Sequence, residues 1–280
     1  MKSSLQALDT PMPYEELENK GPLLVFLHGF PNNYCLFRPQ VESFKENFHI
    51  LNFNLPGSYC GHVNDRKFFR THYIQDTIIE VLKDRIKKHN KKVILVGHDL
   101  GCFILDEVGS QMSAHILGQV LISGMSLKLY TMKIKAPSQL LKSWYVGLLQ
   151  LPGAPLMVKK FLQKKMRKQA YSISHIRDDS PLYTEAPHGF APVYLYQELA
   201  KKALHVKKAL DKSTIPTMFV FGDDDRFLNP PQQEEADELY QHARIEILPG
   251  GHWINRQKIL EVNKLLAGYF EEISSAGREQ

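Results

Sequence analysis

One stretch of the sequence restricts the fold more than any other. The apolar residues 93–96 run unbroken into Gly97, as in a strand buried on both faces, and a helical pattern follows from Leu100 to Gln111. Similar patterns predict further strands at 23–27, 49–53, 119–122, 216–221 and 244–248, and further helices over 73–89 and about 258–273. This alternation is typical of a parallel, doubly wound sheet, so the predicted fold class is α/β.

The segment between the strands at 119–122 and 216–221 has a different pattern. It contains helical stretches and proline-rich breaks but no convincing strand. We therefore expect residues 127–213 to form a helical cap, inserted in a core domain made of residues 1–126 and 214–280. Such a cap would cover the C-terminal edge of the sheet, where α/β enzymes bind ligands. The N-terminal segment is short, so we expect one of the usual leading strands to be missing.

Composition excludes several classes of protein. A net charge of +5, mostly dispersed along 280 residues, does not indicate a nucleic-acid partner. The three cysteines, Cys35, Cys60 and Cys102, are too few and too odd in number for a disulfide scaffold, and we interpret them as free thiols. No apolar run approaches the length of a membrane span. The expected location is the cytosol.

The turn between the strand at 93–96 and the following helix carries a chemical motif. Gly97-His98-Asp99-Leu100-Gly101 has the small-x-nucleophile-x-small form of a nucleophile elbow, in which glycines permit a strained turn that exposes one side chain. The exposed residue would be Asp99 rather than a serine. The alternative is that Asp99 is an ordinary helix N-cap, and the pentapeptide alone does not decide between the two.

An acid and a histidine follow in the order that elbow chemistry requires. Asp225 closes the loop after the strand at 216–221, and His252 follows two glycines after the strand at 244–248. We predict that Asp99 is the nucleophile, that His252 is the general base and that Asp225 orients the imidazole. The neighbouring aspartates lack a histidine or cysteine pair at ligand spacing, so we expect no metal.

The segment His28-Gly29-Phe30-Pro31 follows the first predicted strand, where this arrangement places its second oxyanion donor. The backbone N–H groups of Phe30 and Leu100 would then face the carbonyl oxygen of Asp99. A plain strand-to-loop turn would also explain the glycine and proline.

Taken together, these motifs resemble the epoxide hydrolases of the α/β-hydrolase superfamily over most of the chain. Two cap segments, at 143–153 and 192–197, resemble the lid segments of that family. The resemblance assigns the paired lid tyrosines to Tyr145 and Tyr196 and a cis proline to Pro31. We also expect substrate contacts from the side chains of His28, Pro31, Trp144 and Trp253.

The resemblance implies hydrolysis of an epoxide to a vicinal diol through an ester on Asp99, with no cofactor. The expected partner is a small, apolar epoxide, and the expected assembly is a monomer or homodimer. A haloalkane or haloacid dehalogenase using the same three residues is the first alternative. Leu100 stands where haloalkane dehalogenases use a tryptophan for the halide, and Trp144-Tyr145 replaces the His-Trp pair of fluoroacetate dehalogenases, so we disfavour it. A non-catalytic, ligand-binding member of the fold is the second.

Basic residues gather once, in the predicted cap, around Phe161, Leu162 and Met166. They are Lys159, Lys160, Lys164, Lys165, Arg167 and Lys168. The favoured interpretation of this amphipathic basic helix is a solvated outer face of the cap. Contact with an anionic membrane that supplies lipophilic epoxides is the alternative.

Overall fold

The computed structural model describes residues 4–6, 10–30, 32–58, 63, 65–158, 191–206 and 211–276, built around one eight-stranded sheet. The strands are β1 (Ser4–Gln6), β2 (Tyr14–Leu17), β3 (Leu23–Leu27), β4 (His49–Phe53), β5 (Val93–His98), β6 (Ile116–Ile122), β7 (Thr217–Gly222) and β8 (Ala243–Leu248). They lie in the order β1-β2-β4-β3-β5-β6-β7-β8. The pairs β1–β2 and β2–β4 are antiparallel and all others are parallel, which confirms the predicted α/β class.

The prediction of a missing leading strand is wrong. Both β1 and β2 precede the first apolar run and extend the sheet beyond β4. With only 3 and 4 residues, they are too short for an alternating pattern to reveal them.

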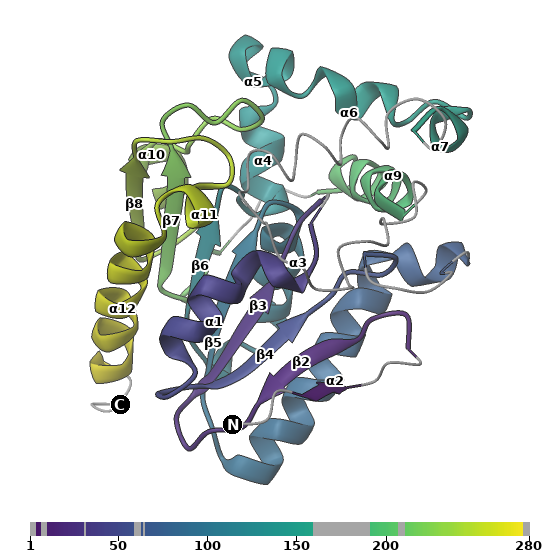
Figure 1. The fold of residues 1–280 in the computed structure, drawn as a ribbon. Coiled ribbons are helices and arrows are strands. Elements are labelled where there is room, and N and C mark those ends of the chain that lie inside the picture. The colour runs from purple at the N-terminus through teal and green to yellow at the C-terminus, as the bar shows by residue number, and fades with distance from the viewer. Residues whose placement is uncertain are drawn as a thin grey trace.

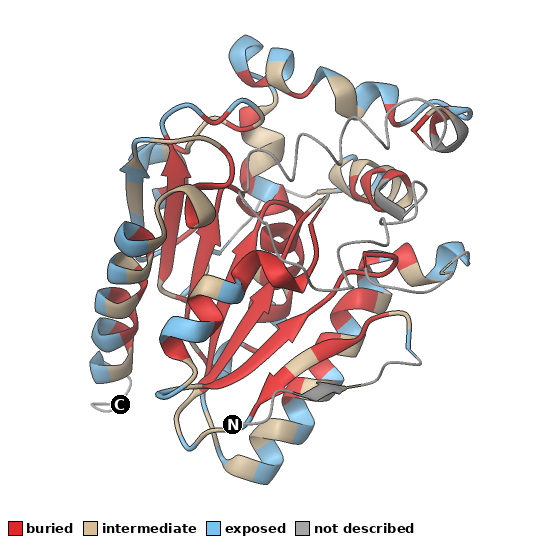
Figure 2. Cartoon of the chain, viewed as in Figure 1, coloured by how far each residue is buried: buried red, intermediate tan, exposed pale blue. Residues whose placement is uncertain are grey.

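Helices cover both faces of the sheet (Figure 1). The helices α1 (Arg38–Phe44) and α12 (Ile259–Ala276) pack on one face, and α2 (Thr71–His89) and α3 (Leu100–Gln111) on the other. Successive strand residues alternate between two apolar layers, so the central strands β3, β4, β5 and β7 are buried throughout, whereas the edge strand β8 is partly exposed. The helices expose their outer surfaces (Figure 2). Each fully buried aliphatic or aromatic side chain stabilises the fold by roughly 1.5–3 kcal/mol.

Short helical turns connect these layers. They are η1 (Tyr34–Phe37), η2 (Arg66–Phe69), η3 (Ser113–His115), α10 (Gln233–Asp237) and α11 (Ile254–Gln257). Both η1 and η2 begin at a residue, Asn33 or Asp65, whose side chain accepts a hydrogen bond from the backbone two residues on, as N-cap residues do.

After β6 the chain forms helices that we call the cap. They are α4 (Leu127–Lys133), α5 (Pro137–Lys142), α6 (Trp144–Leu148), α7 (Ala154–Met157) and α9 (Ala191–Ala203). Figure 1 shows them across the end of the sheet where β5 and β6 finish. In the described part of the chain between β6 and β7, the only β pairing is an isolated bridge at Ser213. The division into a core domain and a cap domain over 127–213 stays a prediction.

Several predicted features fall outside the described residues. They are Pro31, Cys60 and the basic cluster at 159–168. Cys35 and Cys102 are buried, and neither forms a disulfide within the described part of the chain. Of the helices that the structure describes, none combines the length and the apolar character needed to cross a membrane.

A buried charge network ties β2 to the rest of the fold, away from the cap. The Glu16 carboxylate accepts hydrogen bonds from Arg85 Nε at 2.6 Å, Arg85 Nη2 at 2.8 Å and His49 Nε2 at 2.8 Å. Burial raises the pKa of Glu16, but Arg85 and His49 outweigh it and hold the pKa at about 2. The Glu16–Arg85 ion pair therefore joins β2 to α2, and the Glu16–His49 contact joins β2 to β4.

We predict that Glu16→Gln destabilises the protein in a pH-dependent way. The Glu16 pKa is lower in the folded chain than its ordinary value of 4.5, so its contribution to stability is present above pH 4.5 and is lost as the pH falls toward 2. The free energy of unfolding at pH 7 should fall by about 2–3 kcal/mol, measured by urea titration. The control is Glu18→Gln, because Glu18 is exposed and lies 3.9 Å from Lys88. Equal effects of the two substitutions would contradict the prediction.

Candidate active site

The turn between β5 and α3 holds Asp99 in a backbone conformation that L-residues rarely adopt. Its φ is 51° and its ψ is −120°, a strain that costs of order 1–3 kcal/mol. Two glycines make room for the turn: a Cβ on Gly101 would collide with the Leu27 carbonyl oxygen, and one on Gly29 with the Asp99 carboxylate. The Asp99 side chain makes no capping hydrogen bond to α3, so it is not an ordinary N-cap.

His252 lies between two buried carboxylates. Its Nδ1 is 2.9 Å from Asp225 Oδ2, and its Nε2 is 3.4 Å from Asp99 Oδ2. The other oxygen of Asp225 accepts hydrogen bonds from the N–H groups of Phe227 at 2.8 Å and Leu228 at 3.0 Å. The structure thus brings together the three residues that the sequence order singled out.

Charge determines the protonation state of this group. Burial works against a charged imidazole, but the carboxylates of Asp225 and Asp99 outweigh it and raise the pKa of His252 to about 10. Burial also pushes the pKa of Asp225 upward, yet His252 and the two amides hold it below its ordinary value. At neutral pH the arrangement is therefore an imidazolium flanked by two carboxylates.

His98, next to the nucleophile, supports His252 from below. Burial lowers the pKa of His98 to about 4, so its ring is neutral. Its Nε2–H donates a hydrogen bond to the backbone carbonyl of His252 at 3.0 Å. This contact fixes the backbone of His252 relative to β5.

A backbone donor approaches Asp99 from the loop after β3. The N–H of Phe30 donates to Asp99 Oδ1 at 3.0 Å. His28 fixes this loop: its Nδ1–H donates to the Gly29 carbonyl at 2.8 Å, and its Nε2 accepts from the Leu55 N–H at 3.0 Å. Burial lowers the pKa of His28 to about 4, so the ring stays neutral in this role.

The second expected amide, that of Leu100, is the first helical N–H of α3 and has no intrahelical acceptor. Its role as an oxyanion donor stays a prediction.

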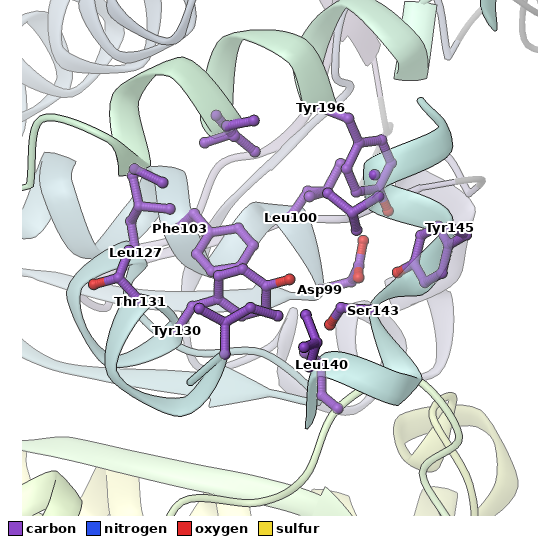
Figure 3. A pocket seen from close by; sticks show the side chains of 17 residues that line it. Asp99, Leu100, Phe103, Leu127, Tyr130, Thr131, Leu140, Ser143, Tyr145 and Tyr196 are labelled. Carbon is purple, nitrogen blue, oxygen red and sulfur yellow. The ribbon is translucent and has the colours of Figure 1, made fainter. Parts of the chain in front are cut away.

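A cavity of about 260 Å³ opens between Asp99 and the cap (Figure 3). Tyr145 from α6 and Tyr196 from α9 line it, and their rings meet edge to face with centroids 6.1 Å apart. Burial and the nearby Asp99 charge both raise the pKa values of these phenols, so they stay protonated and can donate hydrogen bonds. The rest of the wall is mainly apolar side chains from α3, α4, α5 and α9.

Three residues expected to contact substrate do not line this cavity, and we revise that prediction. Trp144 has 64% of its surface exposed, because its neighbour Tyr145 takes the inward position on α6. Trp253 is buried, with its ring centroid 5.1 Å from that of His252, and supports the imidazole from the layer under α12. His28 lies in the wall of a smaller cavity and fixes the Phe30 loop.

Two residues that the sequence did not single out connect the cap to the acid. Phe227 packs its ring against His252, at 4.9 Å between centroids, and against Tyr145 at 6.0 Å. Gln139 of α5 is fully buried; its Nε2 donates to the Phe227 carbonyl at 3.0 Å, and its Oε1 accepts from the Asn229 N–H at 2.8 Å. Phe227 is recognisable only by its position two residues after Asp225, and Gln139 has no sequence signal.

Comparisons with known proteins show which family this chain belongs to and which proteins it resembles. A family model described as alpha/beta hydrolase fold matches residues 22–258. Epoxide hydrolase 3 of Xenopus tropicalis is 26% identical over 277 residues, which span 91% of this chain and 73% of the relative. Epoxide hydrolase 4 of Homo sapiens is 26% identical over 274 residues, spanning 91% and 74%. A Bacillus megaterium epoxide hydrolase, solved in complex with an inhibitor, shares the fold with a TM-score of 0.77 at 18% identity, covering 93% of this chain and 97% of that one.

We predict that Asp225→Asn lowers the pKa of His252 from about 10 toward the ordinary value of 6.5, because the largest charge that stabilises the imidazolium is lost. Nuclear magnetic resonance titration of the imidazole ring measures this directly. Asp224→Asn is the matched control. Asp224 precedes Asp225 in the same loop, but its side chain is exposed, and Asp225 makes the contact with His252. A His252 pKa that is the same in both variants would contradict the assignment of Asp225.

Proposed function

Because this chain belongs to the α/β hydrolase fold family, we propose that it is an epoxide hydrolase, which converts an apolar epoxide to a vicinal diol through an ester on Asp99. One observation carries the proposal: a buried carboxylate and two protonated phenols face the same largely apolar cavity. A carboxylate can displace oxygen at a saturated carbon, and phenols can protonate the oxygen that leaves. The named relatives support the same reaction.

In the first step, Asp99 Oδ2 attacks a ring carbon and the carbon–oxygen bond of the epoxide breaks. The Phe30 N–H holds Asp99 Oδ1, which leaves the other oxygen as the nucleophile. The ring oxygen takes a proton from one of the phenols, Tyr145 or Tyr196, while the second phenol donates a hydrogen bond to it. The product is a hydroxyalkyl ester of Asp99 and one tyrosinate.

Ester formation also prepares the base. Alkylation removes the negative charge of Asp99, one of the groups that raise the pKa of His252, so the imidazolium becomes a stronger acid. Its Nε2 proton then returns to the tyrosinate. His252 is left neutral, with Nδ1–H directed at Asp225 Oδ2 and Nε2 open to accept a proton.

In the second step, a water molecule loses a proton to His252 Nε2 and attacks the ester carbonyl carbon. Negative charge develops on Asp99 Oδ1, where the Phe30 N–H already lies at 3.0 Å. The tetrahedral intermediate then expels the diol oxygen, which takes the proton from His252. The Asp99 carboxylic acid formed in this way passes its remaining proton to His252 Nε2, which restores the starting carboxylate and imidazolium. The sum of both steps is the addition of one water to the epoxide.

We predict that His252→Gln traps the ester. Without the base, ester hydrolysis should slow by at least about 100-fold, while alkylation of Asp99 still proceeds. Incubation with styrene oxide should add the mass of one epoxide to the intact protein, and peptide mapping should locate it on Asp99. The wild type should release diol and accumulate no adduct.

Two controls make this experiment specific. The double variant with Asp99→Asn should form no adduct, and His72→Gln, which changes an exposed histidine of α2, should behave as the wild type. Failure of the wild type to form diol from a panel of epoxides would contradict the proposal. Halide release from chloroalkanes or chloroacetate would then favour a dehalogenase.

We also predict that Tyr145→Phe and Tyr196→Phe each lower kcat for epoxide opening about 10- to 100-fold, because each removes one donor to the leaving oxygen. Single-turnover ester formation in the His252→Gln background measures the step. Tyr194→Phe is the control, since Tyr194 lies on the same helix as Tyr196 but packs on Phe69 and under Arg66, away from the cavity. Equal losses in all three variants would contradict the role of the pair.

A further inference from the structure

A second pair of hydroxyl groups faces the catalytic cavity, on the side away from the paired tyrosines. Tyr130 from α4 and Ser143, just ahead of α6, both line it. In Figure 3 the Asp99 carboxylate lies between this pair and the phenols of Tyr145 and Tyr196. Tyr130 and Asp99 line the same cavity, so a molecule bound there can reach both side chains.

Gln139 anchors this pair from the protein side. Gln139 Nε2 can only donate, and it donates to Ser143 Oγ at 2.9 Å. The Ser143 hydroxyl in turn hydrogen-bonds to Tyr130 and partly opposes the rise in the Tyr130 pKa that burial causes. The Ser143 oxygen can accept from Gln139 while its own proton is donated to the Tyr130 oxygen, and in this arrangement the Tyr130 proton is not used within the pair. That phenol proton can then be donated to a molecule in the cavity, whose wall Tyr130 helps to form.

A phenol O–H group in an apolar cavity wall costs free energy when it is left without a hydrogen-bond acceptor. The Tyr130 ring packs edge-on against Phe103, with centroids 5.7 Å apart, and both rings belong to the cavity wall. The phenol is thus held in place by packing and by the Gln139–Ser143 chain.

We propose that Tyr130, oriented by Ser143, binds an oxygen atom of the substrate on the carbon attached to the epoxide ring. This inference rests on the proposed function and narrows its substrate class to epoxides with an adjacent ether or hydroxyl oxygen, followed by an apolar group. The ring oxygen would meet Tyr145 and Tyr196, the ring carbon Asp99, and the neighbouring oxygen Tyr130. The apolar group would lie against side chains such as Leu127 and Ile134.

Two substrates that differ in a single atom test the proposal. Phenyl glycidyl ether has an oxygen where 4-phenyl-1,2-epoxybutane has a methylene group. The kcat/KM ratio of ether to isostere is measured for wild type, Tyr130→Phe and Ser143→Ala. Comparing the ratio of each variant with that of the wild type removes the difference in intrinsic reactivity between the two epoxides. Because both substrates are measured on the same variant, the ratio does not depend on the fraction of that variant that is active.

We expect Tyr130→Phe to lower the ether-to-isostere ratio about three- to tenfold, as the loss of one neutral hydrogen bond implies. Ser143→Ala should lower it in the same direction by less, because the phenol remains but loses its orientation. Tyr73→Phe is the matched control: its ring packs on Phe68 of η2 at 5.0 Å and lies outside the cavity wall.

Equal losses on both substrates in Tyr130→Phe would overturn the proposal, since Tyr130 would then only shape the cavity. A Tyr130→Phe variant that loses activity on neither substrate would also leave the ratio unchanged and would overturn the proposal as well. Diol from neither substrate with the wild type would refute the proposed function itself, which the adduct experiment on His252→Gln detects independently.

Discussion

The charge pairing of His252 with Asp99 and Asp225 is the interaction on which the rest of the site depends. It requires three loops, after β5, β7 and β8, to meet at one edge of the sheet, and only parallel strands deliver their carboxyl ends to the same edge. The strained turn at Asp99 and the burial of three ionisable groups both oppose folding. The two apolar layers on either side of the sheet offset that cost and make the convergence stable.

The cap covers Asp99 and supplies much of the cavity wall. Enclosing Asp99 beneath apolar side chains removes water, and electrostatic interactions between the remaining polar groups become stronger in such surroundings. Few polar side chains face the cavity, so each has a large effect on what binds there. Their positions are not independent, because Gln139 joins the helix before Tyr145 to the loop that contains Asp225 and Phe227.

The sequence located the central strands and the three residues that meet at His252, for a physical reason. A parallel strand in the middle of a sheet is mostly apolar, which leaves a local signal at residues 93–96. Strained turns need glycines at fixed positions, which leaves a signal at Gly97–Gly101 and Gly250–His252. Contacts between residues that are distant in sequence leave no such local signal. Trp144 was expected at the substrate, but the rotation of a five-residue helix decided that Tyr145 points inward instead. Gln139 donates to Phe227 and accepts from Asn229, which lie about ninety residues further along the chain and give no local signal.

The three hydrogen bonds of Gln139 also bear on how such proteins diversify. Its amide contacts Ser143 within the cap, and Phe227 and Asn229 in the acid loop, so the two segments form a single unit across a sequence gap of about ninety residues. A cap transplanted from a relative would meet a foreign loop and leave this buried amide unsatisfied. We therefore expect a change of substrate specificity by exchange of segments between relatives to require that the cap segment and the acid loop are replaced together.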